Sequence, residues 1–117
     1  MNTSNKLLAE HNAKVVVQDF LNALNAEDFE LARQQLHDDM HFKGVMGERD
    51  GADNYIADMK KMKFKYDIKK VFVDGEEVSL WYNINMGGKT IFCAGWYKLE
   101  DEKIKSFEVI FDPRPVL

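Results

Sequence analysis

The stretch 64–112 constrains the fold more than any other part of this chain. It reads as four strands, because apolar and aromatic residues fill it and short turns divide it at regular intervals. Asp74-Gly75 and Gly87-Gly88 are dipeptides that readily take positive φ, as two-residue hairpin turns require. Asp101-Glu102 stands at the third interval, although it lacks glycine. The sequence therefore predicts a four-stranded antiparallel meander.

Two-residue turns also fix the register, and side chains alternate across a strand, so the meander has two faces. The predicted aromatic face carries Phe64, Tyr66, Ile68, Phe72, Trp81, Asn83, Phe92, Ala94, Trp96, Phe107, Val109 and Phe111. The predicted aliphatic face carries Val71, Val73, Val78, Leu80, Tyr82, Ile84, Ile91, Cys93, Tyr97, Leu99, Ile104 and Ile110. Neither set has the polar character of a face exposed to water, so both faces are predicted to be covered.

Two helices are predicted at the start of the chain. Apolar residues recur at three- and four-residue spacing from Ala13 to Leu24, which predicts one helix with an apolar stripe. Asp28 then stands as the N-cap of a shorter second helix, and residues 37–39 end it. The first helix is the only segment long enough to lie across the meander.

A short strand and a third helix complete the predicted order. Met40–Lys43 is predicted as a brief strand, and the glycine-rich segment 44–51 as an irregular loop. Asp50 or Asp53 is expected to cap the third helix, in which apolar residues recur from Tyr55 onwards. The fold class is therefore α+β, in the order ααβαββββ, with the three helices packed on one face of a strongly bent antiparallel sheet.

Composition narrows the function classes. With 117 residues the chain has room for a single hydrophobic core, so we expect one domain over residues 1–117. The formal net charge of −4 gives no indication of nucleic-acid binding. A single cysteine, Cys93, excludes an intrachain disulfide and a multi-cysteine metal site. No segment reads as a membrane span or a secretory leader, so a cytoplasmic protein without a membrane or nucleic-acid partner is expected.

One run of sequence carries a resemblance to a known family. VVVQDFLNALNAEDFELARQQLHDDMHFKG is followed by the glycine-rich loop, a short helix and a meander that closes on IFDPRP. In these features the chain resembles the nuclear transport factor 2-like superfamily, which includes SnoaL-like polyketide cyclases, Δ5-3-ketosteroid isomerase and limonene epoxide hydrolase. The resemblance implies a cystatin-like cone that usually keeps a pocket, but it implies no particular activity.

The ketosteroid isomerase is the sharpest comparison within that superfamily. Its chemistry needs a tyrosine and a protonated acid as oxyanion donors and a second carboxylate as proton shuttle. The resemblance places these positions at Phe20, at about Trp96 and at Gly44, respectively. None of these residues has the required group, so we expect no isomerisation of a Δ5-3-ketosteroid.

The predicted function is the binding of a small apolar molecule, of unknown identity, in an aromatic-lined cavity. The resemblance implies that the cavity wall coincides with the predicted aromatic face, where Asn83 and the indole N–H groups would supply the polar contacts. The alternative is that these rings simply fill the core. The candidate ligand-binding residues are Phe20, Phe42, Tyr55, Met59, Trp81, Asn83, Trp96, Phe107 and Phe111.

A second function remains open, namely a SnoaL-like enzyme of isomerase, cyclase or hydrolase type that uses an acid or a histidine at the cavity mouth. His41 and Asp112 are its candidate catalytic residues. The cluster 37–41 straddles a helix end, so a metal site is not predicted, and no motif calls for a cofactor. Glu108 and Asp112 face away from the predicted cavity, unless a bulge in the last hairpin reverses the strand.

The predicted aliphatic face leads to a prediction about partners. The helices can cover only one face, so this second apolar face needs a partner, and the simplest is a second copy of the chain. The alternative is that the face assignment is reversed, and that the helices or the C-terminal tail cover these residues. The expected homodimer interface comprises Leu80, Tyr82, Ile84, Ile91 and Tyr97.

Overall fold

The structure is a computed structural model that describes residues 3–117. Its helices are α1 (Thr3–Asn25), α2 (Phe29–Gln34) and α3 (Ala52–Met62), with a short 3-10 helix, η1 (Arg114–Val116), near the end. Its strands are β1 (Leu36–Gly44), β2 (Gly47–Asp50), β3 (Lys65–Asp74), β4 (Glu77–Met86), β5 (Lys89–Glu100) and β6 (Lys103–Phe111). The predicted α+β class with helices packed on a curved sheet is confirmed.

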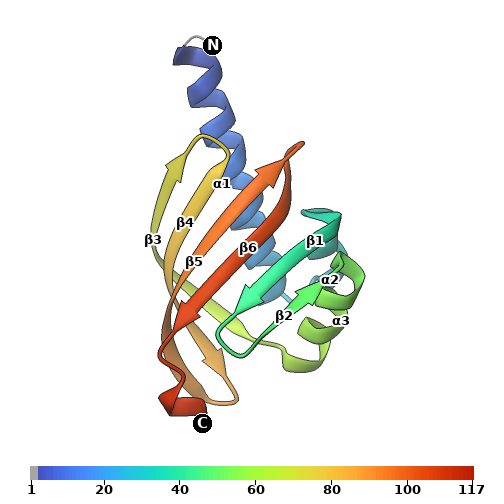
Figure 1. The fold of residues 1–117 in the computed structure, drawn as a ribbon, viewed down its shortest axis with the longest axis vertical. Helices are drawn as coiled ribbons and strands as arrows, with labels where there is room; N and C mark the ends of the chain where they lie inside the picture. Colours follow the sequence, from blue (N-terminus) through green and yellow to red (C-terminus); the bar gives the residue numbers. More distant parts are fainter. Residues whose placement is uncertain (1–2) are drawn as a thin grey trace.

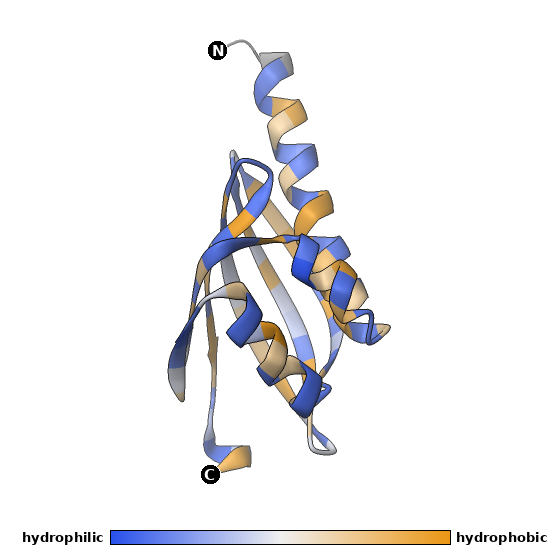
Figure 2. Cartoon of the chain, turned by 90° about the vertical axis from the view of Figure 1, so that its right-hand side faces the viewer, coloured by the Kyte–Doolittle hydropathy of each residue, from blue (hydrophilic) through white to orange (hydrophobic). Residues whose placement is uncertain are grey.

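The strands form one sheet in the order β2-β1-β6-β5-β4-β3 (Figure 1). β1 pairs with β6 in parallel, and the other pairs are antiparallel. We call the face that contacts α1 the inner face and the opposite one the outer face. The first turns of α1 extend beyond the sheet, and hydrophilic and hydrophobic residues alternate along them (Figure 2). Within the described chain, no helix is long and apolar enough to cross a membrane.

The glycine-rich segment forms a hairpin, so the prediction of an irregular loop there is wrong. β1 begins at Leu36 and therefore includes residues 37–39, which had been predicted to end the second helix. β2 follows as its partner, with Gly44 opposite Gly47 and His41 opposite Asp50. All four residues of β2 are exposed, so the strand has no apolar alternation that would reveal it in the sequence.

The turns of the meander agree closely with the prediction. Met86 pairs with Lys89, and Glu100 with Lys103, so Gly87-Gly88 and Asp101-Glu102 are the two-residue turns expected. Asp101 and Glu102 both take positive φ, at 53° and 61°. The first turn lies one residue further on than predicted, at 75–76, which leaves the faces unchanged.

The α3 cap differs from the prediction. The N-cap residue is Gly51, with φ 88°, and no side chain caps the helix there, so neither Asp50 nor Asp53 has the predicted role. A side-chain cap is present on α2, as predicted, where Asp28 Oδ1 accepts a hydrogen bond from Leu31 N at 3.1 Å.

Two β-bulges change which residues face the helices. In β3, Ile68 pairs with Tyr82 but Lys70 pairs with Trp81, so Lys69 is an extra residue. In β6, Ile104 pairs with Leu99 but Ser106 pairs with Lys98, so Lys105 is extra. An extra residue reverses the facing of the strand beyond it. The residues moved to the inner face in this way are Tyr66, Ile68, Phe107, Val109 and Phe111.

The structure reverses the predicted roles of the two faces. The inner face is the predicted aliphatic one, with Val78, Leu80, Tyr82, Ile84, Ile91, Cys93, Tyr97, Leu99 and Ile104 buried. The outer face bears Phe72, Trp81, Phe92 and Trp96, each about half exposed. The predicted dimer interface of Leu80, Tyr82, Ile84, Ile91 and Tyr97 is therefore wrong, because these residues lie in the core. Alternation separates two faces but does not show which one the helices cover.

Hydrogen bonds of Asn25 connect the end of α1 to the start of β3. Its side-chain Oδ1 accepts a hydrogen bond from Tyr66 N at 2.7 Å, and its Nδ2 donates one to Tyr66 O at 2.8 Å. Lys65 Nζ also donates to Asn25 O at 2.9 Å. One amide side chain thus satisfies both backbone groups of a residue whose own side chain lies on the inner face.

We expect Asn25→Ala to destabilise the domain, because it leaves both backbone groups of Tyr66 without this partner. The cost is about 1–3 kcal/mol in the free energy of unfolding, measured with urea. Asn22→Ala, at an exposed position on the same helix, is the control and should change stability little. Equal effects of the two substitutions would contradict a role for the Asn25 hydrogen bonds.

Candidate ligand-binding cavity

A cavity of about 290 Å³ lies between the inner face of the sheet and the helices. α1 contributes Phe20 and Leu21, and α3 contributes Tyr55, Asp58, Met59 and Met62. The β1–β2 hairpin contributes Phe42 and residues 44–49, so it closes one side. The sheet contributes Tyr66, Tyr82, Ile84, Met86, Tyr97, Phe107, Val109 and Phe111. Elements from both halves of the chain therefore meet at one site.

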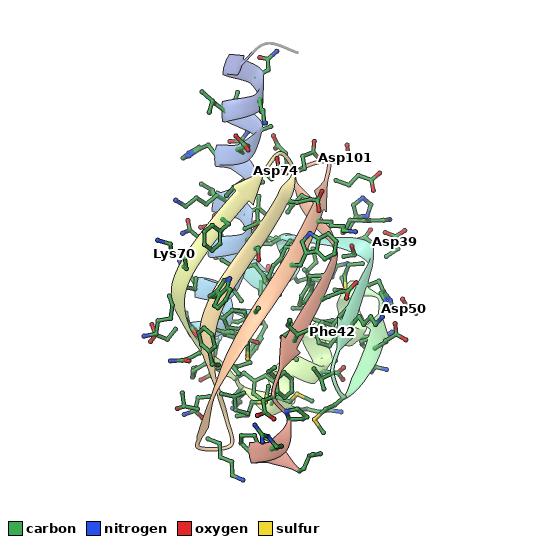
Figure 3. All side chains as sticks on the ribbon, turned by 60° about the vertical axis from the view of Figure 1, so that its left-hand side comes forward. Asp39, Phe42, Asp50, Lys70, Asp74 and Asp101 are labelled. Atoms are coloured by element: carbon green, nitrogen blue, oxygen red, sulfur yellow. The ribbon has the colours of Figure 1, made fainter. Side chains whose placement is uncertain are left out.

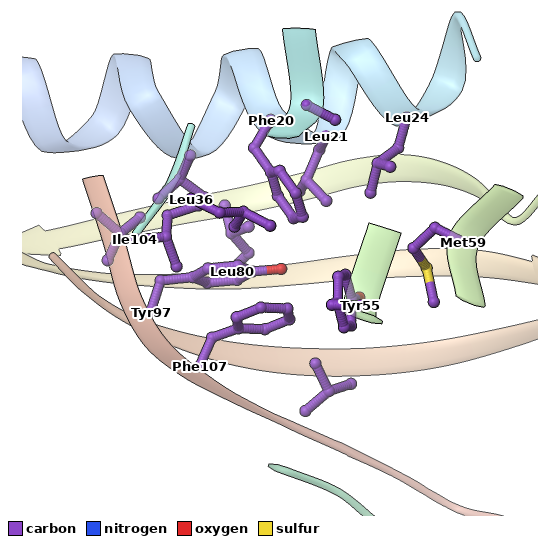
Figure 4. Packing of buried hydrophobic residues seen from close by; sticks show 14 of the residues in the cluster. Phe20, Leu21, Leu24, Leu36, Tyr55, Met59, Leu80, Tyr97, Ile104 and Phe107 are labelled. Carbon is purple, nitrogen blue, oxygen red and sulfur yellow. The ribbon is translucent and has the colours of Figure 1, made fainter. Parts of the chain in front are cut away.

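Phe107 lies at the centre of a cluster of rings. It stacks on Tyr97 with ring centroids 4.7 Å apart and an interplanar angle of 7°. Its centroid is 5.0 Å from that of Phe42, 5.3 Å from Tyr55 and 6.0 Å from Phe20. Figure 4 shows the side chains of Phe20, Tyr55, Tyr97 and Phe107 gathered between α1 and the strands. The wall of the cavity is thus built of aromatic edges and faces.

All four tyrosines of the chain line the cavity. Tyr55 and Tyr66 influence each other's pKa, and so do Tyr82 and Tyr97, so the four hydroxyl groups form two neighbouring pairs. The Tyr66 hydroxyl donates to Met59 Sδ at 3.7 Å. Burial is the main cause that raises the pKa of each of the four tyrosines above its ordinary value of 10. The hydroxyls are therefore protonated at neutral pH and can donate hydrogen bonds.

Gly95 allows two of these tyrosines to lie against the sheet. A Cβ atom at this position would lie 2.9 Å from Tyr97 Cε1 and 3.3 Å from Tyr82 Cε1. Contacts this short would force the rings to move, so a side chain here would disturb the tyrosine pair. The glycine lies inside a strand, which is a recognised sign of close approach by neighbouring groups.

Charged groups in the cavity lining belong to its mouth. Arg49 Nε lies 2.9 Å from Asp58 Oδ2, and the pair joins β2 to α3. Glu48 is largely exposed beside them. Met46 in the hairpin turn and Met62 at the end of α3 are 64% and 52% exposed, so flexible apolar side chains also frame the entrance. The charged mouth and the uncharged interior are thus distinct parts of the site.

The structure brings most of the predicted ligand-binding residues together. Phe20, Phe42, Tyr55, Met59, Phe107 and Phe111 all line the cavity. Trp81, Asn83 and Trp96 lie on the outer face and do not, so their predicted place in the wall is wrong. The prediction missed Tyr66, Tyr82 and Tyr97, although the alternative of a reversed face assignment would have found the last two.

Neither predicted catalytic residue reaches the cavity. Asp112 is exposed and forms an ion pair with Arg114. Glu108 lies opposite Trp96 in the β5–β6 ladder, on the outer face. The bulge in β6 reverses the strand, which was the predicted alternative. Glu108 and Asp112 nevertheless lie outside the cavity. Cys93 is buried, and burial raises the pKa of its thiol to about 11, so it is not a thiolate at neutral pH. No group of acids, histidines and cysteine among residues 3–117 is arranged to hold a metal ion.

His41 lies on the exterior of the β1–β2 hairpin, where it is held by two carboxylates. Its Nδ1 is 2.6 Å from Asp50 Oδ1, and its Nε2 is 3.1 Å from Glu48 Oε1. The hydrogen bond with Asp50 and then that with Glu48 raise the pKa of His41 above its ordinary value of 6.5. The protonated ring therefore bridges β1 and β2 beside the cavity mouth. Figure 3 shows Asp50 at this edge of the sheet, next to β1, which carries Phe42.

A family model for the SnoaL-like domain matches residues 17–107. The chain belongs to the SnoaL-like domain family. Among solved structures, this SnoaL-like domain is similar to an NTF2-like protein of unknown function from Cytophaga hutchinsonii ATCC 33406. The two share 47% identity over 89% of this chain and 93% of that one, with a TM-score of 0.88. No curated protein matches the chain.

Two further structures share the fold of this SnoaL-like domain. An LEH-like epoxide hydrolase of M. tuberculosis has 24% identity over 90% of this chain and 86% of that one, with a TM-score of 0.80. A putative ketosteroid isomerase from Kribbella flavida DSM 17836 has 11% identity over 88% and 79%, with a TM-score of 0.81. The predicted nuclear transport factor 2-like fold is thereby confirmed.

The structure corrects one of the three positions that the sequence comparison with ketosteroid isomerase assigned. Phe20 and Gly44 line the cavity of this SnoaL-like domain, as the comparison implied. Trp96 does not, because its side chain lies on the outer face, whereas the next residue, Tyr97, lies in the wall with a hydroxyl group. The cavity therefore has a hydrogen-bond donor close to a position that the sequence comparison had left without one.

The His41 bridge predicts a pH dependence of stability. Because the folded-state pKa of His41 is raised, the bridge stabilises the fold fully below pH 6.5, and its contribution is lost as pH rises through that raised value. We expect the difference in unfolding free energy between wild type and His41→Gln to shrink from about pH 6 to about pH 9.

The same bridge can be followed directly by NMR titration of the imidazole. Asp50→Asn and Glu48→Gln should each lower the pKa of His41, and Asp19→Asn, an exposed carboxylate on α1, is the charge-matched control. A His41 pKa that is the same in all four proteins would show that the carboxylates do not hold the proton.

Proposed function

We propose that this SnoaL-like domain binds a small, uncharged, mainly apolar molecule that carries an oxygen atom able to accept a hydrogen bond. The observation behind the proposal is the chemistry of the cavity, where aromatic and aliphatic walls surround tyrosine hydroxyls. Such a combination of apolar walls and a few oriented polar groups is typical of small-molecule sites. The cavity volume of about 290 Å³ favours a ligand smaller than most drugs.

The buried part of the ligand must be uncharged. Deep in the cavity the polar groups are phenol hydroxyls, and the ionic groups of the lining, Glu48, Arg49 and Asp58, belong to the mouth. A charge placed among the rings would lose its hydration without gaining an opposite charge. A carbonyl, ether or hydroxyl oxygen would instead accept a hydrogen bond from a protonated tyrosine at little cost.

The tyrosine pairs supply this donor without rearrangement of the fold. Tyr97 is fixed by its stacking on Phe107, and Tyr66 by the backbone hydrogen bonds of Asn25. Among the described residues, no buried side-chain nitrogen or oxygen atom lacks a hydrogen-bond partner. A ligand oxygen needs only to approach a hydroxyl group whose ring is already held in place, which supports binding of neutral oxygen compounds.

An enzyme remains the alternative, and the Asp58 carboxylate favours it. Among the described lining residues the carboxylates are Glu48 and Asp58, and Arg49 holds Asp58 in place at the mouth. Asp58 is therefore the group that would serve as a general base, in place of the originally predicted His41 or Asp112. Two structural neighbours are described as enzymes, but their low identity carries only the fold to this chain.

The test compares three ligands that share one bicyclic ring system: 2-acetylnaphthalene, 2-naphthoate and naphthalene. Isothermal titration calorimetry should show the ketone binding most tightly, because it alone is both uncharged and able to accept a hydrogen bond. Tyr97→Phe and Tyr55→Phe keep the rings and remove a hydroxyl, so each should weaken ketone binding about three- to tenfold and leave naphthalene binding unchanged.

Trp81→Phe on the outer face is the control and should leave ketone binding unchanged. Naphthoate binding as tightly as the ketone would contradict the uncharged class of ligand. No binding of any of the three at millimolar concentration would remove the proposed function. Mass spectrometry of the same mixtures decides the alternative, because turnover that disappears in Asp58→Asn would establish an enzyme.

A further inference from the structure

β2 is an edge strand that buries none of its own side chains. All four of its residues are exposed, and its neighbour in the sheet is β1 (Figure 1). Gly47 begins the strand, and Gly51 follows it with φ 88°. Polar, glycine-rich strands have a weakly specified register, and the same segment carries the local sequence signals of a loop. β2 therefore belongs to the part of the fold that opens most easily.

Ionic side-chain contacts hold β2 against its two neighbours. Glu48 and Asp50 both contact His41 of β1, at 3.1 Å and 2.6 Å. Arg49 contacts Asp58 of α3 twice, with Nε 2.9 Å from Oδ2 and with Nη2 donating to Oδ1 at 3.3 Å. All three charged side chains of the strand are thus engaged, two with β1 and one with α3.

The same segment forms one side of the cavity mouth. Residues 44–49 line the cavity, and Val45 and Met46 of the hairpin turn are exposed. The end of α3, with Met62, belongs to the same lining. The width of the mouth therefore depends on how closely β2 is held to α3. We call residues 45–50 the strap.

We propose that the strap separates from β1 and α3 to admit the ligand, and that His41 makes this opening depend on pH. The inference rests on the proposed function, because it concerns how ligand exchange at that cavity is regulated. A protonated imidazole has two N–H groups and can donate to both carboxylates, whereas a neutral imidazole has one. Loss of the proton therefore releases one of the two contacts between β1 and the strap, and the strap opens more often.

The other charged groups on the His41 side of β1 have partners outside the strap. Asp39 Oδ1 lies 2.7 Å from a lysine Nζ of β6 and 2.9 Å from His37 Nδ1. Lys43 lies opposite Glu108 of β6 in the ladder. The carboxylate that α3 presents to the strap is paired with the strap's arginine. Carboxylates and lysines keep their charge between pH 6 and about pH 9, so the imidazole that contacts the strap carries the change.

Hydrogen exchange of one backbone amide tests the opening without any ligand. Gly51 N donates to Met40 O of β1 at 2.8 Å, so this amide exchanges when the strap separates from β1. At pH 6, Asp58→Asn and His41→Gln should each lower the protection factor of Gly51, measured by NMR, about two- to fivefold. Asp67→Asn breaks an ion pair of β3 and is the control, which should leave Gly51 unchanged.

A second amide separates opening of the strap from unfolding of the whole domain. Ile104 N donates to Gln35 O at 2.8 Å, next to the start of β1. In the wild type, Gly51 should be at least about tenfold less protected than Ile104, because the strap opens while the rest of the fold persists. Equal protection of the two amides, or a Gly51 amide that neither strap variant affects, would overturn the proposal.

Ligand kinetics test the link to pH. Stopped-flow fluorescence with uncharged 2-acetylnaphthalene gives the association and dissociation rate constants. Both should rise by the same factor, about two- to fivefold, between about pH 6 and about pH 9, with Kd unchanged, because the ligand enters and leaves through one opening. The raised pKa of His41 places the rise above pH 6.5. Burial raises the pKa of the four tyrosines, so the donors in the cavity stay protonated over this range.

Two histidine variants assign the pH dependence. His41→Gln should remove it from both rate constants, whereas His37→Gln, on the same strand, should keep it. Wild-type rate constants that do not change with pH, or the same pH dependence in both variants, would overturn the proposal. Failure of the ketone to bind would remove the proposed function, whereas the exchange of Gly51, which needs no ligand, still decides whether the strap opens.

Discussion

One extra residue in β6, Lys105, decides which side chains fill the interior of this domain. Because of this bulge, Phe107, Val109 and Phe111 face the helices, and Glu108 and Ile110 face outwards. The opposite register would place a carboxylate among aromatic rings without a cation, which costs several kcal/mol. It would also expose Phe107, whose burial contributes about 1.5–3 kcal/mol. Hydrophobic burial and charge desolvation therefore select the same bulged register.

The walls of the cavity depend on how the aromatic rings that form them are held in place. Phe107 contacts rings from α1, β1, α3 and β5, so the walls are fixed by elements that are far apart in the sequence. Gly95 lets the Tyr82 and Tyr97 rings lie against the sheet, while the β1–β2 hairpin arches over the other side. The tyrosine hydroxyls place polar atoms in an apolar space, and no buried side-chain nitrogen or oxygen atom of the described residues lacks a hydrogen-bond partner. A preorganised donor is thus available to a ligand oxygen at low cost.

The sequence predicted which helices and strands form better than it predicted which side of the sheet their side chains face. Helix periodicity and glycine-containing turns are local signals, so α1, α3 and the turn at 87–88 were found. β2 has no apolar alternation, and both bulge residues are lysines in otherwise ordinary strands, so neither feature has a local signal. Which face the helices cover is a tertiary property, and the comparison with the isomerase, which placed the cavity wall on the aromatic face, led to the wrong choice.

The candidate site shows how these errors combine. Phe20, Phe42, Tyr55 and Met59 lie outside the meander, so the reversed faces did not affect them. Phe107 and Phe111 reach the cavity only because the bulge cancels the wrong choice of face. Trp81, Asn83 and Trp96 have no bulge between them and the turn that sets their register, so for them the error stands.

The central strands, β4 and β5, connect the wall of the cavity to the outer face of the sheet. Trp81 is followed by Tyr82, and Trp96 by Tyr97, so adjacent residues point to opposite sides of the same backbone. The inner member of each pair lines the cavity, and the outer member is about half exposed on the outer face. The backbone of these two strands therefore sets both where the tyrosine hydroxyls lie and which indoles face outwards.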